Sequence, residues 1–64
     1  MKAMILFDPQ DSFYSVIFTD KYLHFVKDVP QKTIEINESE EEWIRKTVSE
    51  MEELQQWLEK KFST

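Results

Sequence analysis

The chain has 64 residues and no cysteine, so it forms at most one small domain without disulfides or thiolate metal sites. Its single histidine, His24, excludes a multi-histidine zinc site as well, and we expect neither a metal nor a cofactor. Eight basic residues stand against 13 acidic ones, for a net charge of −5. This balance argues against direct nucleic-acid binding, because neutralising phosphates requires a clustered positive surface.

The first residues have the basic and then apolar order with which a signal peptide begins. The apolar run after Lys2 has five residues and ends at Asp8, whereas a secretory core needs about 7–15. No other stretch approaches the roughly 18 apolar residues of a membrane span. The missing cysteines fit a reducing compartment. We therefore expect a cytoplasmic protein without a membrane partner.

Four β-strands are predicted in the first half, at about residues 2–7, 13–19, 22–28 and 33–36. The first is apolar and is followed by Asp-Pro, which suits a type I turn. The second is aromatic and β-branched, and the last alternates apolar with polar residues. The third also fits a short helix, because its apolar residues recur at helical spacing. That segment stays open between the two, with a strand favoured.

The chain contains no glycine, the residue that reaches positive φ most readily. Tight primed hairpin turns are therefore disfavoured, and loops of about three to five residues built on Asp, Asn or Pro are expected. Consecutive strands joined by such loops predict a three- to four-stranded antiparallel β-meander.

One long amphipathic helix is predicted at about residues 40–62. Ser39 and Glu42 match a capping box, and Lys60 and Lys61 suit the negative end of the helix dipole. At about 100° per residue, the apolar side chains fill half of the helix surface, more than a coiled-coil seam requires. The sequence therefore predicts an α+β fold, a single domain over residues 1–64 whose helix packs on one sheet face. The apolar half comprises Trp43, Ile44, Thr47, Val48, Met51, Leu54, Trp57, Leu58 and Phe62.

The predicted strands carry apolar residues on both faces, whereas one helix covers only one face. We expect the uncovered face to present Tyr14, Val16 and Phe18, as an apolar patch typical of an interface. Such a patch favours a homodimer, since small chains need additional burial and two-fold dimers are the commonest oligomers. A face for a different protein, and a sheet that curls into a small barrel, are the alternatives.

Two further features suggest partner binding. Trp57 lies at the edge of the apolar half of the helix, as either a boundary residue or a binding anchor. The acidic run Glu38, Glu40 and Glu41 fits helix capping, or mimicry of nucleic-acid phosphates towards a basic groove. Interspersed lysines weaken the second interpretation.

Catalytic chemistry has little support in the sequence. His24 is the only candidate base for the serines, and Asp8 and Asp11 are explained by a turn. Without glycine there is no phosphate-binding loop. We expect a protein that is not an enzyme.

In general character the chain is similar to small accessory proteins of phages and other mobile elements. That similarity implies a protein-binding module that modulates, typically inhibits, a larger host protein. The alternatives are a structural subunit of a complex and a nucleic-acid-mimicking inhibitor.

Overall fold

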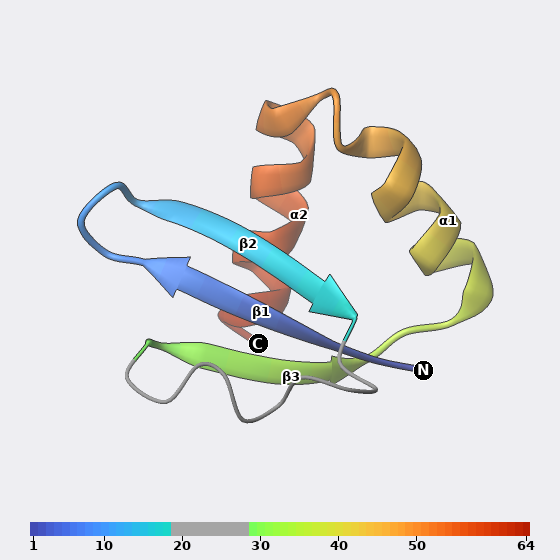
Figure 1. Cartoon of the computed structure of the whole chain (residues 1–64), viewed down its shortest axis with the longest axis horizontal. Coiled ribbons are helices and arrows are strands. Elements are labelled where there is room, and N and C mark those ends of the chain that lie inside the picture. Colours follow the sequence, from blue (N-terminus) through green and yellow to red (C-terminus); the bar gives the residue numbers. More distant parts are fainter. Residues whose placement is uncertain (19–28) are drawn as a thin grey trace.

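The computed structural model describes residues 1–18 and 29–64 (Figure 1). In this part of the chain an antiparallel sheet of three strands is followed by two helices, which confirms an α+β architecture. The predicted strand at 22–28, and its helical alternative, lie outside the described residues. The elements are β1 (Lys2–Asp8), β2 (Phe13–Phe18), β3 (Gln31–Glu35), α1 (Glu38–Thr47) and α2 (Met51–Phe62).

The strand order is β2-β1-β3, so β1 is central among the described strands. A β-meander would place the strands in chain order, and the described strands therefore do not form one. The reason is that β3 pairs with β1 instead of following β2, with Ala3 opposite Ile34 and Phe7 N–H donating to the Pro30 carbonyl at 2.9 Å. Because both neighbours run antiparallel to β1, β2 and β3 point in the same direction.

The connection between β1 and β2 is made without glycine, as the sequence predicts. The Asp8 carboxylate accepts hydrogen bonds from the backbone N–H groups of Gln10 (3.0 Å) and Asp11 (3.4 Å). Ser12 then adopts a positive φ of 50°, a conformation that is uncommon for a residue with a side chain. The four residues between the strands fall within the predicted loop length.

The predicted single helix at 40–62 is wrong in one respect, because the structure divides it into α1 and α2. The chain turns at Val48–Glu50, where Glu50 has φ −112° and ψ 72° and donates its N–H to the Thr47 carbonyl at 2.8 Å. A 23-residue helix would span about 34 Å, whereas the seven residues of β1 span about 23 Å. The turn folds α1 back against α2, which packs on β2 and β3.

The helix begins earlier than predicted, at a different capping residue. Asn37, not Ser39, is the N-cap, and its side chain accepts the Glu40 N–H at 2.8 Å. Glu40 in turn accepts the Asn37 N–H at 3.0 Å, which completes the capping box. Asparagine caps as well as serine does, so both registers fit the sequence.

The core lies between the helices and one face of the sheet (Figure 1). Its buried residues are contributed by all these layers and are Ala3, Ile5, Ile36, Ile44, Leu54 and Leu58. Residues paired across an antiparallel ladder share a face. Ala3 pairs with Phe18, Ile5 with Val16 and Phe7 with Tyr14, and so the three β2 side chains point towards the helices.

The expectation that Tyr14, Val16 and Phe18 form the uncovered face is therefore wrong. Their side chains are half-buried and pack against the core. The opposite face carries Met4 and Ile17, of which Met4 is only 3% exposed. A hollow of about 450 Å³ continues that face past the end of β1, and its lining includes Leu6 and Val29.

Within the described residues, neither helix is long and apolar enough to cross a bilayer. The longer one, α2, has 12 residues.

Candidate protein-binding surface

The outer edge of β2 presents backbone groups that β1 does not use. Phe7 turns its N–H towards β3, so Phe7 and its partner Tyr14 form a pair without mutual backbone hydrogen bonds. The backbone groups of Tyr14, Val16 and Phe18 consequently point away from β1. In the described part of the chain, Val16 and Phe18 have no partner for these outward N–H and C=O groups.

Gln55 covers the third outward position with both ends of its side-chain amide. Its Oε1 accepts the Tyr14 N–H at 2.7 Å, and its Nε2 donates to the Tyr14 carbonyl at 2.6 Å. The side chain thus takes the place of a neighbouring strand at this one residue. It also fixes α2 against β2 at the start of the strand.

The two outer strands differ in the charge that they carry. β2 has the sequence FYSVIF, with no charged residue and no proline. β3 carries Lys32 and Glu35, of which Lys32 contacts the Thr64 carbonyl and Glu35 lies 3.6 Å from the N-terminal ammonium group. Charged side chains protect sheet edges against pairing with other chains. The edge of β2 lacks this protection.

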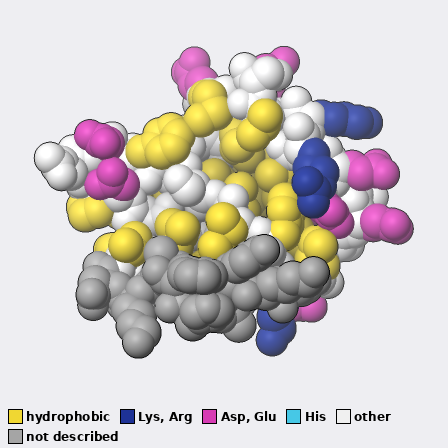
Figure 2. All heavy atoms as spheres, viewed as in Figure 1, with side chains coloured by type: hydrophobic (Ala, Val, Ile, Leu, Met, Phe, Trp, Pro, Cys, Tyr) yellow, Lys and Arg dark blue, Asp and Glu magenta, His cyan; other side chains and the backbone are white. Residues whose placement is uncertain are grey.

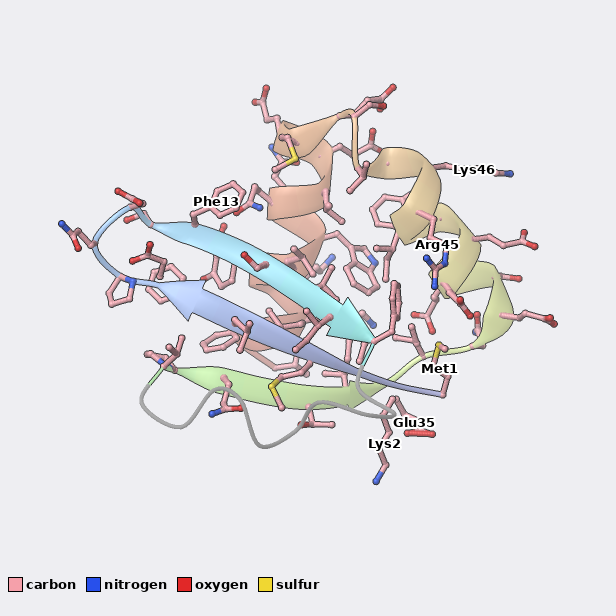
Figure 3. The ribbon with its side chains drawn as sticks, viewed as in Figure 1. Met1, Lys2, Phe13, Glu35, Arg45 and Lys46 are labelled. Atoms are coloured by element: carbon pink, nitrogen blue, oxygen red, sulfur yellow. The ribbon has the colours of Figure 1, made fainter. Side chains whose placement is uncertain are left out.

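Exposed apolar side chains lie at the start of β2 and at the turn between α1 and α2. Phe13 is 38% exposed at the start of β2, and Val48 and Met51 are 58% and 43% exposed at the turn between the helices. Met51 lies one helical turn before Gln55 and therefore on the side of α2 that meets β2. Figure 2 shows hydrophobic side chains gathered along this margin, and Figure 3 places Phe13 on it. We call this set, the edge of β2 with Phe13, Val48 and Met51, the β2 edge surface.

The predicted aromatic binding residues on β2 serve in packing. The Tyr14 ring lies 4.7 Å from Phe7 and 5.5 Å from Phe62, in an aromatic cluster under α2. The Phe18 ring lies under the guanidinium of Arg45 at 4.5 Å. The groups of β2 that have no partner among the described residues are the outward backbone groups of Val16 and Phe18.

Trp57 is half-buried and lies away from β2. Its ring is 5.4 Å from that of Trp43, and the Lys61 ammonium lies 5.5 Å from its centre. Together with the capping residues of α1, the two tryptophans line a shallow hollow of about 370 Å³. The structure thus places Trp57 apart from the β2 edge surface.

The three predicted glutamates have separate local roles. Glu38 is exposed in the first turn of α1, and Glu40 belongs to the capping box. Glu41 accepts two hydrogen-bonding contacts from Arg45, at 3.0 and 3.1 Å. Arg45 also covers Phe18 and so connects α1 to the end of β2. Glu41 pairs with the guanidinium that makes this contact.

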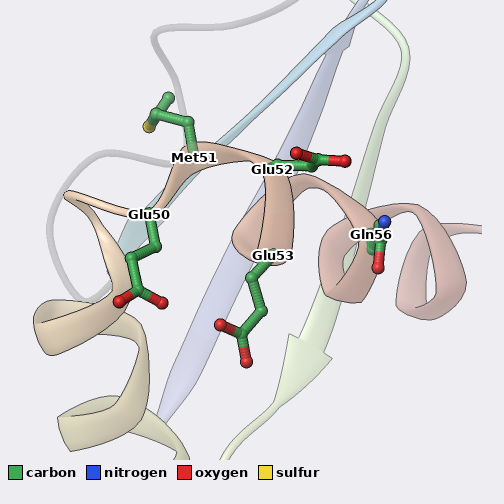
Figure 4. A pocket seen from close by; sticks show the side chains of 5 residues that line it. All are labelled: Glu50, Met51, Glu52, Glu53 and Gln56. Carbon is green, nitrogen blue, oxygen red and sulfur yellow. The ribbon is translucent and has the colours of Figure 1, made fainter.

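A second acidic group lies at the start of α2. Glu50 and Glu53 point to the same side, whereas Met51 points away (Figure 4). The pKa of Glu53 is raised by the hydrogen bond that its protonated carboxyl donates to the Glu50 carboxylate, by desolvation, and by repulsion from the Glu50 charge. Within the described residues, no three acidic or imidazole groups are arranged to hold a metal ion.

Sequence reasoning missed Phe13, Val48, Met51 and Gln55 as surface residues. A continuous helix places Val48 and Met51 on its buried side, and only the turn at 48–50 exposes them. The available signal was the run Thr47-Val48-Ser49, because these three residues have lower helix propensity than Lys46 and Glu50 on either side. Gln55 has no sequence signal, since its role depends on the fold bringing α2 beside β2.

Comparisons with protein-family models, with curated proteins and with solved structures found no match to this chain.

Proposed function

We propose that the chain is a non-catalytic protein-binding module that binds through the β2 edge surface. The observation that carries the proposal is the pair of outward backbone positions at Val16 and Phe18, without a partner in the described chain, with exposed apolar side chains at the start of β2 and at the turn between the helices. An extended segment of another protein added to this edge would lengthen the sheet, a common mode of recognition.

The energy available at this edge is adequate for specific binding. Each of the two residues offers one donor and one acceptor, and each hydrogen bond contributes about 0.5–1.5 kcal/mol net. Burial of a fully exposed large apolar side chain contributes about 1.5–3 kcal/mol, and Phe13, Val48 and Met51, which are 38%, 58% and 43% exposed, retain roughly half of that each. Hydrogen bonds would set the direction of the partner strand, and the apolar residues would supply most of the affinity.

Binding of this kind acts by occupancy and needs no turnover. It is compatible with modulation of a larger protein, as in accessory proteins of mobile elements, and with an assembly role. Phosphate mimicry has less support, because Glu40 and Glu41 are already engaged in capping and in pairing with Arg45. His24 lies outside the described residues, and no catalytic arrangement is proposed.

The test is capture of protein partners by three versions of the chain. Val16→Pro removes one outward N–H, a change that an edge strand tolerates when that N–H is not in the ladder. Thr33→Pro is the matched control, because the backbone of Thr33 faces the outer side of β3. We expect proteins captured by the wild type and by Thr33→Pro to be lost with Val16→Pro. An identical set of captured proteins for all three versions would contradict the proposal.

A further inference from the structure

We infer that the occupant of the β2 edge is a second copy of this chain, paired antiparallel through β2 about a two-fold axis at Ile17. The inference rests on the proposed binding site and names its partner. The two copies would form one six-stranded sheet, in the order β3-β1-β2 and then β2-β1-β3 of the partner.

The pattern of open backbone groups selects this register. The Gln55 side chain occupies the outward N–H and C=O groups of Tyr14, so Val16 and Phe18 are the two positions left open on the described edge. In a two-fold antiparallel pair centred on Ile17, Val16 of each copy lies opposite Phe18 of the other. Each such pair exchanges two N–H···O=C hydrogen bonds, and every open group finds a partner. A centre at Val16 would direct Phe18 onto Tyr14, which Gln55 already occupies.

The side chains are consistent with the same register. Ile17 is half-buried on the face opposite the helices, where it pairs with Met4. Across the two-fold axis Ile17 meets its own copy in a pair without mutual backbone hydrogen bonds, where side chains lie closest. On the other face, the half-buried side chains of Val16 and Phe18 meet each other.

Charge on β2 itself does not oppose a second copy at this edge. β2 carries no charge, so the net charge of −5 on each copy is not concentrated where the two would meet. Arg45, whose guanidinium lies over the Phe18 ring, is already paired with Glu41. In the dimer the outer strands of the described sheet would be the two β3 strands, which carry Lys32 and Glu35. Pairing thus covers the unprotected edge and leaves the protected ones outside.

The sharpest test is a disulfide across the two-fold axis. The chain has no cysteine, so a single one is an unambiguous reporter. Facing residues at such a pair have Cα atoms about 4.5 Å apart, within disulfide range. We expect Ile17→Cys to form a covalent dimer rapidly on mild oxidation. Ser15→Cys, two residues away on the same face, is the control, because its copy lies four residues along the strand, about 13 Å away.

A second measurement uses chains in which Ile17 is unchanged. Light scattering is expected to give the wild type and Thr33→Pro twice the 7.8 kDa mass of one chain, and Val16→Pro the mass of one chain. Equal cross-linking of both cysteine variants, a monomeric wild type, or a dimeric Val16→Pro would overturn the inference. If the wild type is monomeric but capture of other proteins still depends on Val16, then the proposed function stands and only the identity of the partner is wrong.

Discussion

At the scale of single residues, Gln55 determines how much of the β2 edge is open. Its amide imitates a neighbouring strand at Tyr14, with hydrogen bonds of 2.7 and 2.6 Å. A side-chain amide is well suited to this role, because it carries one acceptor and one donor group, as a backbone unit does. The open segment is consequently reduced to the two positions that define the proposed register.

Replacement of Gln55 by alanine is expected to destabilise the fold by about 1–2 kcal/mol, because two hydrogen bonds are lost and water satisfies their partners only in part. Urea unfolding measures the change. Gln56→Ala is the matched control, since Gln56 is the next residue of α2, is exposed and lines the acidic hollow at the start of that helix. Equal effects of the two substitutions would contradict the role assigned to Gln55.

Glu53 gives the fold a pH dependence of defined sign. Its pKa is raised by the Glu50 hydrogen bond, by desolvation and by the Glu50 charge. The stabilisation from its protonated form is therefore present below the ordinary pKa of a glutamate and is lost as the pH rises through the raised pKa. We expect Glu53→Gln to have the higher melting temperature at neutral pH, and the difference from the wild type to shrink on acidification. A difference that stays constant with pH, or that matches Glu52→Gln, would exclude this interpretation.

At the scale of elements, the sequence predicts the kinds of structure better than their limits. The strands at 2–7 and 13–19 are found within one residue of β1 and β2, because their composition and the Asp-Pro turn are local signals. The helix at 40–62 contains both observed helices, yet its periodicity continues through the turn at Val48–Glu50. The low helix propensity of Val48 and Ser49 is a weak local signal for that turn, and the apolar periodicity outweighs it.

The N-terminus of α1 offers a direct choice between two capping residues. Asn37→Ala removes the side-chain acceptor of the Glu40 N–H and is expected to cost about 1 kcal/mol. Ser39→Ala, at the position that the sequence suggested, is expected to change the free energy of unfolding by less than half as much. Thermal or urea unfolding compares the two variants. A larger loss of unfolding free energy for Ser39→Ala would identify Ser39, and not Asn37, as the N-cap.

The sequence singles out the strand that carries the candidate binding site, but not the chemical groups that are available for binding. The sequence singles out residues 13–19 because they are apolar and uncharged. It assigns the binding to side chains, because the predicted strands carry apolar residues on both faces and one helix covers only one of them. Only the strand order β2-β1-β3 makes β2 an outer strand of the described sheet, and so turns attention to its backbone.

At the scale of the whole molecule, the limiting quantity is the apolar surface that so small a chain can bury. A domain of this size buries only about 60% of the surface that its unfolded chain exposes. Pairing through β2 would bury further apolar surface, with Ile17 at its centre. It would also remove an uncharged, aromatic and β-branched edge from solvent, the kind of segment that otherwise promotes aggregation.

Backbone amide exchange at β2, followed by NMR at increasing dilution, is a direct test of whether a second copy occupies the edge of β2. The Tyr14 amide is an internal reference, because Gln55 protects it within one chain. We predict that the amides of Val16 and Phe18 are protected in concentrated solution and lose that protection on dilution, whereas Tyr14 stays protected throughout. If the Val16 and Phe18 amides exchange as fast as those of the exposed turn at Gln10 and Asp11 at every concentration, then no second copy occupies the edge of β2.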